Sequence, residues 1–247
     1  MDIEKVWRTI LKDIHKQGYL HNKDDAEIKE VLNVSAWIDS PISNMGGNIF
    51  VNSDKYIEFI RAGLYDIDGY NLKGDALADY VASINDKNKI RIAYNDDSDF
   101  VYTYPERLKA IPVAQKYDNF MGTEENQIGH MIMRLEQNPG SNRAVATLYN
   151  VGLDPYWIDD IPCLNWLQAL IREDDLYLAV MFRSNDIYNA FPSNMMFISN
   201  IGLLMVESLR KTYPNLQFAG IYYNCTSAHY YTDVVTDDII EKITKGV

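Results

Sequence analysis

The segment LYLAVMFRS at residues 176–184 constrains the fold most, because both sides of a strand formed there would be largely apolar. Such a run predicts a buried strand. The segments around it continue the pattern: strands are expected at 143–150 and 163–171, a long helix at 194–214, and another strand at 216–231. This succession predicts an α+β fold in which helices pack against a mixed β-sheet.

The first half of the chain predicts a helix, a strand and then a long region dominated by loop signals. Residues 3–16 place Val6, Ile10 and Ile14 on one face, which indicates an amphipathic helix. Gly, Asp and Asn are concentrated at about 65–116, which predicts a loop-rich region. A strand is expected at 28–38, and further helices at 53–65, at 76–84 and from Glu125 to Gln137. The sequence shows no repeat or linker, so one domain over 1–247 is expected.

Charge and cysteine content exclude several classes of protein. The formal net charge of −12 over 247 residues opposes binding to nucleic acid, because that affinity depends on clustered Lys and Arg. Two cysteines, Cys163 and Cys225, are too few for a disulfide or zinc framework, and no metal site is expected. No segment has the run of apolar residues that a membrane span or a secretion signal needs, so a cytoplasmic protein without membrane contact is expected.

Six short motifs between residues 124 and 232 carry the functional signal, because each is weak alone but their order is specific. In chain order they are a helix ended by NPGSNR, then NVG, IPC, FRSND, FPSN and HYY. This order resembles the thymidylate synthase and deoxycytidylate hydroxymethylase superfamily over a little under half of the chain. The resemblance implies the fold of that superfamily, in which helices pack on a large mixed sheet and two subunits meet back to back through their sheets.

The resemblance also assigns a role to individual residues. Cys163 falls on the nucleophile of the superfamily, and Asn194 falls on the residue that reads the edge of the pyrimidine. The remaining assignments are Arg183 and Ser184 to the nucleotide phosphate, Arg143 to the same phosphate from the other subunit, Asp186 to the folate pterin, His229 and Tyr231 to the sugar 3′-hydroxyl, and Tyr117 to the catalytic tyrosine, with Tyr94 as the second choice.

The chemistry of the superfamily explains why these residue types belong together. C5 of a pyrimidine is a poor nucleophile until a thiolate adds at C6, and sulfur both attacks strongly and leaves again. The activated C5 then attacks the one-carbon unit of 5,10-methylenetetrahydrofolate, and the intermediate accepts hydride to give methyl or water to give hydroxymethyl. A free thiol is mostly protonated at neutral pH, so a nearby guanidinium such as Arg183 would help Cys163 to ionise.

Each candidate also has a structural interpretation. A lone cysteine such as Cys163 on an apolar strand is more often structural than catalytic when judged by position alone. Cys225 is expected to be a small core residue rather than a second nucleophile, and His229 taken alone could be a buried core histidine. The joint order of the motifs is what favours the catalytic interpretation of Cys163.

Three departures from the superfamily pattern affect charged positions. The segment HNKDDAEIKE at 21–30 has no Arg where thymidylate synthases carry one, and hydroxymethylase relatives also lack it. Asn142 stands in the first position of a paired arginine. The helix at 53–65 has Ile60 where the superfamily has a catalytic glutamate, and Glu58 two residues earlier would face another side. The missing arginines predict weaker binding of the phosphate, and the missing glutamate leaves the catalytic carboxylate unassigned.

We therefore expect folate-dependent one-carbon transfer to C5 of a pyrimidine nucleotide monophosphate by a homodimer that uses Arg143 across its interface. A dUMP or dCMP hydroxymethylase-like enzyme is the leading hypothesis, and thymidylate synthase is the alternative. Asn194 favours a uracil base, because its NH2 can donate to O4 while its carbonyl accepts from N3–H. A nucleotide-binding protein of the same fold that has lost turnover is the alternative from another class.

Overall fold

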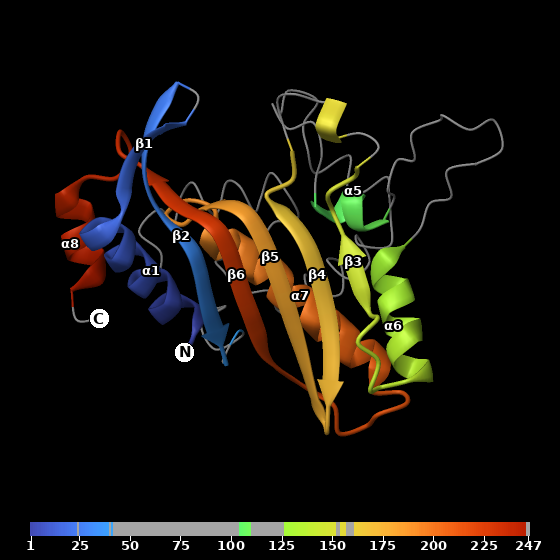
Figure 1. Cartoon of the computed structure of the whole chain (residues 1–247). Coiled ribbons are helices and arrows are strands. Elements are labelled where there is room, and N and C mark those ends of the chain that lie inside the picture. The colour runs from blue at the N-terminus through green and yellow to red at the C-terminus, as the bar shows by residue number, and fades with distance from the viewer. Residues whose placement is uncertain are drawn as a thin grey trace, which may run out of the picture.

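The computed structural model describes residues 1–23, 25–39, 41, 104–109, 126–151, 154–156 and 161–245. Its centre is a six-stranded sheet in the order β1-β2-β6-β5-β4-β3 (Figure 1). β5 and β6 are parallel, and the other neighbours are antiparallel, so the predicted mixed sheet is confirmed. The strands are β1 Tyr19–Lys23, β2 Ala26–Ile38, β3 Val145–Thr147, β4 Leu164–Arg172, β5 Asp175–Asp186 and β6 Gln217–Tyr231.

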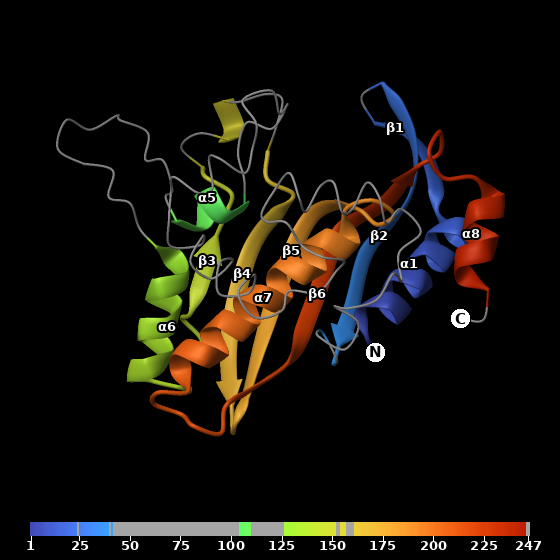
Figure 2. The same cartoon turned by 180° about the vertical axis from the view of Figure 1, so that it is seen from behind.

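The longer helices all lie on one face of this sheet. Figure 2 shows α7 running across that face, with α1 and α8 on one side of it and α6 on the other. The helices are α1 Ile3–Gln17, α5 Tyr104–Lys109, α6 Gln127–Gln137, α7 Phe191–Leu209 and α8 Asp237–Thr244, with a 3₁₀ turn, η1, at Asp154–Tyr156. None of the helices in the described ranges is long and apolar enough to cross a membrane.

α1 forms where the sequence predicts it because its start, its faces and its end all favour a helix. The Asp2 side chain accepts a hydrogen bond from the Lys5 backbone N–H at 2.8 Å, which caps the helix. Its apolar face buries residues from Ile3 to Ile14, while the Trp7 ring N–H donates to the Ile187 carbonyl oxygen at 2.7 Å. That bond joins α1 to the turn that follows β5.

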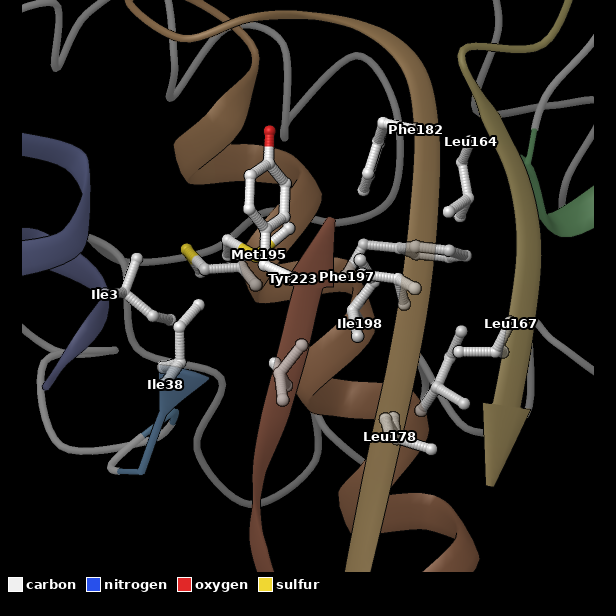
Figure 3. Close-up of a cluster of buried hydrophobic side chains, with 14 of the residues drawn as sticks. Ile3, Ile38, Leu164, Leu167, Leu178, Phe182, Met195, Phe197, Ile198 and Tyr223 are labelled. Atoms are coloured by element: carbon white, nitrogen blue, oxygen red, sulfur yellow. The ribbon is translucent and has the colours of Figure 1, made fainter. Parts of the chain in front are cut away.

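α7 is apolar on nearly every side, and most of its side chains are buried. Two of its buried polar side chains donate to backbone carbonyls of their own helix: Ser199 to Met195 at 2.7 Å, and Asn200 to Met196 at 2.8 Å. Figure 3 shows side chains from α7 and from strands β4 to β6 in one cluster, in which Phe182 is fully buried. Each such side chain contributes about 1.5–3 kcal/mol by burial.

The opposite face of the sheet carries aromatic side chains with no helix of the described ranges upon them. Trp37, Tyr177 and Tyr222 form a cluster there, with the Trp37 and Tyr222 ring centroids 4.5 Å apart. Tyr222 is 46% exposed and Met181, one strand away, is 40% exposed. We call these four residues the open-face cluster.

The structure confirms the helix at 3–16 and the strand at 28–38, and it alters several other boundaries. The strand expected at 143–150 shrinks to three residues, and the helix expected at 194–214 begins at Phe191 and ends at Leu209. β1 and α8 were not predicted. The helices expected at 53–65 and 76–84 lie outside the described residues, as does most of the loop-rich region, in which 104–109 forms α5. A single domain over 1–247 stays a prediction.

Candidate active site at the carboxyl ends of β5 and β6

The sheet topology brings most of the candidate residues to one end of the sheet. β5 and β6 run in parallel, so their carboxyl ends lie side by side, and Asp186 is paired with His229. Cys163 directly precedes β4, and its carbonyl accepts a hydrogen bond from the Arg183 backbone N–H at 2.8 Å. α7 starts five residues after β5 ends and places Asn194 in its first turn. We call this region the site end of the sheet.

Arg183 holds the segment that leads into Cys163. Its guanidinium donates to two backbone carbonyls, from Nε to Pro162 at 3.1 Å and from Nη2 to Ile161. The Arg183 side chain is exposed, while Cys163 is half-buried. The arrangement therefore keeps a permanent positive charge beside the segment that carries the thiol, and it uses a guanidinium because only that group presents several donors in a fixed plane.

Ser184 and Asp186 continue β5 beyond Arg183. Ser184 is buried and is paired with Ser227 of β6. The Asp186 carboxylate accepts three hydrogen bonds, from the backbone N–H groups of Tyr188 and Asn189 and from the Asn189 side chain, at 2.8–3.0 Å. Asp186 thus holds the turn before α7, and a carboxylate with about four acceptor positions has one left for a ligand.

His229 is buried, and its ring orientation follows from its partner. Nδ1 lies 3.4 Å from the Ser227 carbonyl oxygen, an atom that can only accept. Nδ1 therefore carries the proton in the neutral ring, and Nε2 is the acceptor. Nε2 is buried and has no hydrogen-bond partner among the residues that the structure describes. Because an unsatisfied buried acceptor is costly, this atom is suited to a hydroxyl supplied by a ligand.

Burial is the main reason why the pKa of His229 lies below its usual value, and the Lys23 ammonium lowers it further. Asp186 and Glu30 act in the opposite direction and are outweighed. The ring is consequently neutral at physiological pH, which keeps Nε2 available as an acceptor.

Lys23 and Tyr231 form a second polar group beside His229. Lys23 Nζ lies 3.3 Å from the Tyr231 hydroxyl and 5.6 Å from the centre of the Tyr231 ring. The rings of His229 and Tyr231 meet edge to face at 5.5 Å. Sequence reasoning missed Lys23, because the hairpin of β1 and β2 that brings it here was not predicted.

Asn194 is held by a buried neighbour that sequence reasoning also missed. Its side-chain Nδ2 donates to Asn185 Oδ1 at 3.0 Å, and Asn185 Nδ2 in turn donates to the Tyr223 hydroxyl at 3.0 Å. Asn185 is 2% exposed and Tyr223 is fully buried. The position of Asn185 inside the FRSND motif was the available signal, although nothing in the sequence indicates that it contacts Asn194.

Tyr104 is the tyrosine that the described structure places next to Cys163. Its hydroxyl accepts a hydrogen bond from the Leu164 backbone N–H at 3.3 Å, and its ring lies 6.0 Å from that of Phe197 in α7. Tyr117 and Tyr94, the two tyrosines favoured by the sequence, lie outside the described residues. Glu58 and Ile60 lie outside them as well.

Arg143 lies far from the site end of its own sheet. The Ala144 carbonyl accepts from the Ala169 N–H, so Arg143 lies near Leu170, seven residues along β4 from Cys163. At about 3.3 Å per residue that is about 23 Å, which no arginine side chain spans. Arg143 is exposed, and Asn142 before it accepts a hydrogen bond from Arg172 at 2.6 Å.

Comparison with protein families decides the classification of the chain. The sequence profile of the family described as thymidylate synthase matches residues 68–246, which is more than half of the chain. The chain belongs to the thymidylate synthase family. The match includes every strand from β3 to β6 and every site residue that the sequence assigned, whereas α1, β2 and β1 with Lys23 precede it.

Individual relatives of this thymidylate synthase family member are distant. A "Putative thymidylate synthase" of Methanocaldococcus jannaschii is 33% identical over 147 residues, which are 58% of this chain and 60% of that protein. The deoxyuridylate hydroxymethyltransferase of Bacillus phage SP01 is 26% identical over 245 residues, which are 98% of this chain and 60% of that protein. A protein of Methanothermobacter marburgensis with the same name as the first is 24% identical over 231 residues, which are 93% of this chain and 90% of it. The chain thus spans about three fifths of the length of the first two.

Two observations describe how the site residues of this thymidylate synthase family member are arranged. Cys163, Arg183, Asn194, His229 and Tyr231 do lie at one end of one sheet. Among the described carboxylates, none makes a hydrogen bond to the Asn194 side chain, whose partner is the Asn185 amide.

Proposed function

We propose that the protein transfers a one-carbon unit from 5,10-methylenetetrahydrofolate to C5 of a pyrimidine nucleotide monophosphate, with Cys163 as the nucleophile that adds to C6. The observation that carries this proposal is the convergence of a thiol, a guanidinium, an amide and a neutral histidine acceptor at one end of the sheet. Membership of the thymidylate synthase family supports it.

The residues of the chain divide the work by chemical type. The Cys163 thiolate adds to C6, which makes C5 a nucleophile toward the one-carbon unit, and leaves again when the product forms. Arg183 and Ser184 bind the phosphate, and the Arg183 charge favours the ionised thiol. His229 Nε2 accepts from the sugar 3′-hydroxyl, with the Tyr231 hydroxyl beside it.

Two tyrosines and one aspartate complete the proposal. The Tyr104 hydroxyl accepts a hydrogen bond from the backbone N–H of Leu164, the residue after Cys163, and in this proposal it exchanges a proton near the base. Tyr117 is the alternative catalytic tyrosine, which the sequence favours. Asp186 contacts the folate with the acceptor position that the turn leaves open. Methylenetetrahydrofolate supplies the one-carbon unit as co-substrate.

Hydroxymethylation is the leading product assignment, and methylation is the second. Support for the first is the phage deoxyuridylate hydroxymethyltransferase, whose similarity extends over 98% of this chain. Support for the second is the name of the archaeal relatives, one of which is 33% identical over 58% of this chain and another 24% identical over 93% of it. The outcome depends on whether water or hydride reaches the intermediate at C5.

Release of tritium from C5-labelled dUMP or dCMP in the presence of methylenetetrahydrofolate tests the reaction. We expect the wild-type protein to release tritium, and Cys163→Ala to bind the nucleotide but release none. The product mass separates methyl from hydroxymethyl. Binding without release by the wild-type protein would instead identify a nucleotide-binding protein that has lost turnover, and the enzyme proposal would be wrong.

We further propose that the protein is a homodimer joined through the open-face cluster. Four apolar side chains lie on a sheet face that no described helix covers, and Arg143 is about 23 Å from Cys163 of its own chain. In a back-to-back pair, Arg143 enters the site of the other subunit and adds a cation to its phosphate group.

Mixing two inactive variants tests this arrangement. Cys163→Ala and Arg143→Ala are each expected to be inactive or nearly so, but their heterodimer has one site with both residues intact. Subunit exchange at equal concentration should therefore restore about a quarter of the wild-type activity. No recovery, with exchange demonstrated by native mass spectrometry, would show that Arg143 serves no neighbouring site.

A further inference from the structure

Two exposed arginines, Arg143 and Arg172, lie close together on the sheet face that carries the open-face cluster. Leu170 is paired with Tyr177 of that cluster, and directly paired residues point to the same face. Arg172 follows two residues later on β4 and therefore points the same way. Arg143 lies beside Leu170 and also points there, because Ala144 after it is buried on the helix side. Figure 1 views this face, with α7 behind the sheet.

Asn142 holds the guanidinium of Arg172 next to Arg143. Arg172 Nη2 donates to Asn142 Oδ1 at 2.6 Å, and its Nη1 donates to the Ile171 carbonyl oxygen at 2.7 Å. Gln168 Nε2 donates to the Asn142 backbone carbonyl at 2.7 Å, which ties the same segment to β4. Because Asn142 directly precedes Arg143, these bonds keep a second guanidinium beside the first.

Neither arginine forms an ion pair with a carboxylate among the residues that the structure describes. Asp175 is paired with Arg172 in the sheet, but its two oxygens accept from the Gln217 side chain at 2.8 Å and from the Tyr177 hydroxyl at 3.2 Å. Neighbouring like charges repel each other until an anion binds between them. In a chain of formal net charge −12, this pair of cations is therefore a place for an anionic ligand.

The anion cannot be one bound at the site end of the same sheet. Arg172 lies nine residues along β4 from Cys163, which is about 30 Å. Arg183 at the site end points to the same face as Met181 of the open-face cluster, because it follows two residues later on β5. The cluster thus lies between a site with one arginine and a far end with two. When two sheets meet through this face about a two-fold axis that crosses the strands, the far end of each meets the site end of the other.

We propose that Arg172 binds the nucleotide phosphate in the site of the other subunit, where it and Arg143 act together. The proposal rests on the function and the homodimer proposed above. Asn142 leaves the first position of the paired arginine without a charge, and Arg172 returns a guanidinium to that place from the neighbouring strand. The phosphate then supplies the counter-charge that two arginines need when the faces meet, and Arg183 of its own chain completes the clamp.

The first test compares the dissociation constants of dUMP and deoxyuridine, which differ only in the phosphate; dCMP and deoxycytidine replace them if the protein binds the cytosine nucleotide. Arg172→Ala should weaken binding of the nucleotide by about ten- to hundredfold, because a charge-assisted contact is lost, and leave binding of the nucleoside unchanged. Adding Asn142→Arg to that variant should restore the preference for the nucleotide, because position 142 then carries the guanidinium itself.

Arg134→Ala is the matched control, because Arg134 is an exposed arginine in the last turn of α6, on the helix side of the sheet. It removes the same charge and should keep the wild-type ratio of the two dissociation constants. Thermal unfolding of each variant shows that it folds.

The second test shows in which subunit Arg172 acts. Wild-type protein is mixed with an excess of Cys163→Ala, so that nearly every intact thiol belongs to a heterodimer. A second mixture uses Cys163→Ala/Arg172→Ala instead. The KM for dUMP in tritium release should be about ten- to hundredfold higher in the second mixture, although the subunit that carries the thiol is wild type in both.

An equal KM in the two mixtures, with subunit exchange shown by native mass spectrometry, would overturn the proposal. So would an equal loss of nucleotide and nucleoside binding in Arg172→Ala, or no recovery when Asn142→Arg is added. A wild-type protein that binds dUMP but releases no tritium would refute the proposed function alone, because the ratio of dissociation constants would still decide this inference. A wild-type protein that binds neither nucleotide would refute both.

Discussion

The buried ion pair of Arg107 and Asp154 gives the sharpest stability prediction. Arg107 Nη2 and Asp154 Oδ1 are 2.7 Å apart, and the side chains are only 11% and 1% exposed. The other Asp154 oxygen accepts from the Asn150 N–H at 2.6 Å. The pair joins α5, which carries Tyr104, to the 3₁₀ turn nine residues before Cys163. It therefore anchors two elements of the candidate site to each other.

The expected cost of breaking the pair follows from its burial. With an effective dielectric constant of about 20, two charges about 4 Å apart attract by about 4 kcal/mol. Most of that attraction offsets the desolvation of both groups, but removal of one partner leaves the other charge buried and alone. Asp154→Asn and Arg107→Met should each lower the free energy of unfolding by about 3–5 kcal/mol, and the double variant should cost much less than their sum.

Urea unfolding followed by tryptophan fluorescence measures these values, with all variants at one protein concentration so that any association affects them equally. The control is Asp238→Asn, which removes one partner of an ion pair with Lys242 whose side chains are both 73% exposed. It should cost less than about 1 kcal/mol. The reasoning is refuted if Asp154→Asn costs no more than the control, or if the two single losses simply add.

Three further predictions concern the site and the core. Lys23→Met should raise the pKa of His229 toward its usual value, because the Lys23 ammonium is the second cause of the low pKa after burial. An NMR titration of the His229 ring measures this pKa, and an unchanged pKa in the variant would contradict the position of Lys23. The unfolded chain binds a proton at His229 that the folded chain does not, so the free energy of unfolding should fall as the pH drops through about 6.5. Urea unfolding at a series of pH values measures this fall, and His229→Asn should make it smaller. An equally steep fall in the variant would show that other groups cause it. Gly202→Ala places a Cβ 2.5 Å from the Phe218 ring and should cost about 1–3 kcal/mol in thermal unfolding, whereas a cost near zero would show that the ring moves freely.

Elements with a strong hydrophobic period could be predicted from the sequence, and elements defined by pairing could not. α1 repeats its apolar residues at the helical period, so its buried face is visible without a structure, and β2 is indicated by β-branched residues with partial alternation. β1 is different, because Tyr19 and Leu20 are exposed and the strand exists through its backbone bonds to β2. α8 has only eight residues and two buried positions, too few for a periodic signal.

The candidate site divides in the same way. The order of motifs identified which residues belong to the site, because that order is a property of the chain itself. It could not show that Lys23 reaches Tyr231, which is 208 residues away, or that Asn185 holds Asn194. Such pairs arise from the register of β2, β5 and β6 and from the start of α7, which bring together residues that are far apart in the sequence.

The central claim is that Cys163 forms the covalent bond to the pyrimidine. A dUMP analogue with fluorine at C5 cannot lose a proton there, so the covalent complex with methylenetetrahydrofolate should persist once it forms. Mass spectrometry of peptides from the trapped protein measures where the adduct lies, and Cys225 serves as the internal comparison because it is the other free cysteine. The account predicts nucleotide and folate together on the peptide that contains Cys163. An adduct on the Cys225 peptide, or none on either in a protein that releases tritium from C5-labelled dUMP, would contradict it.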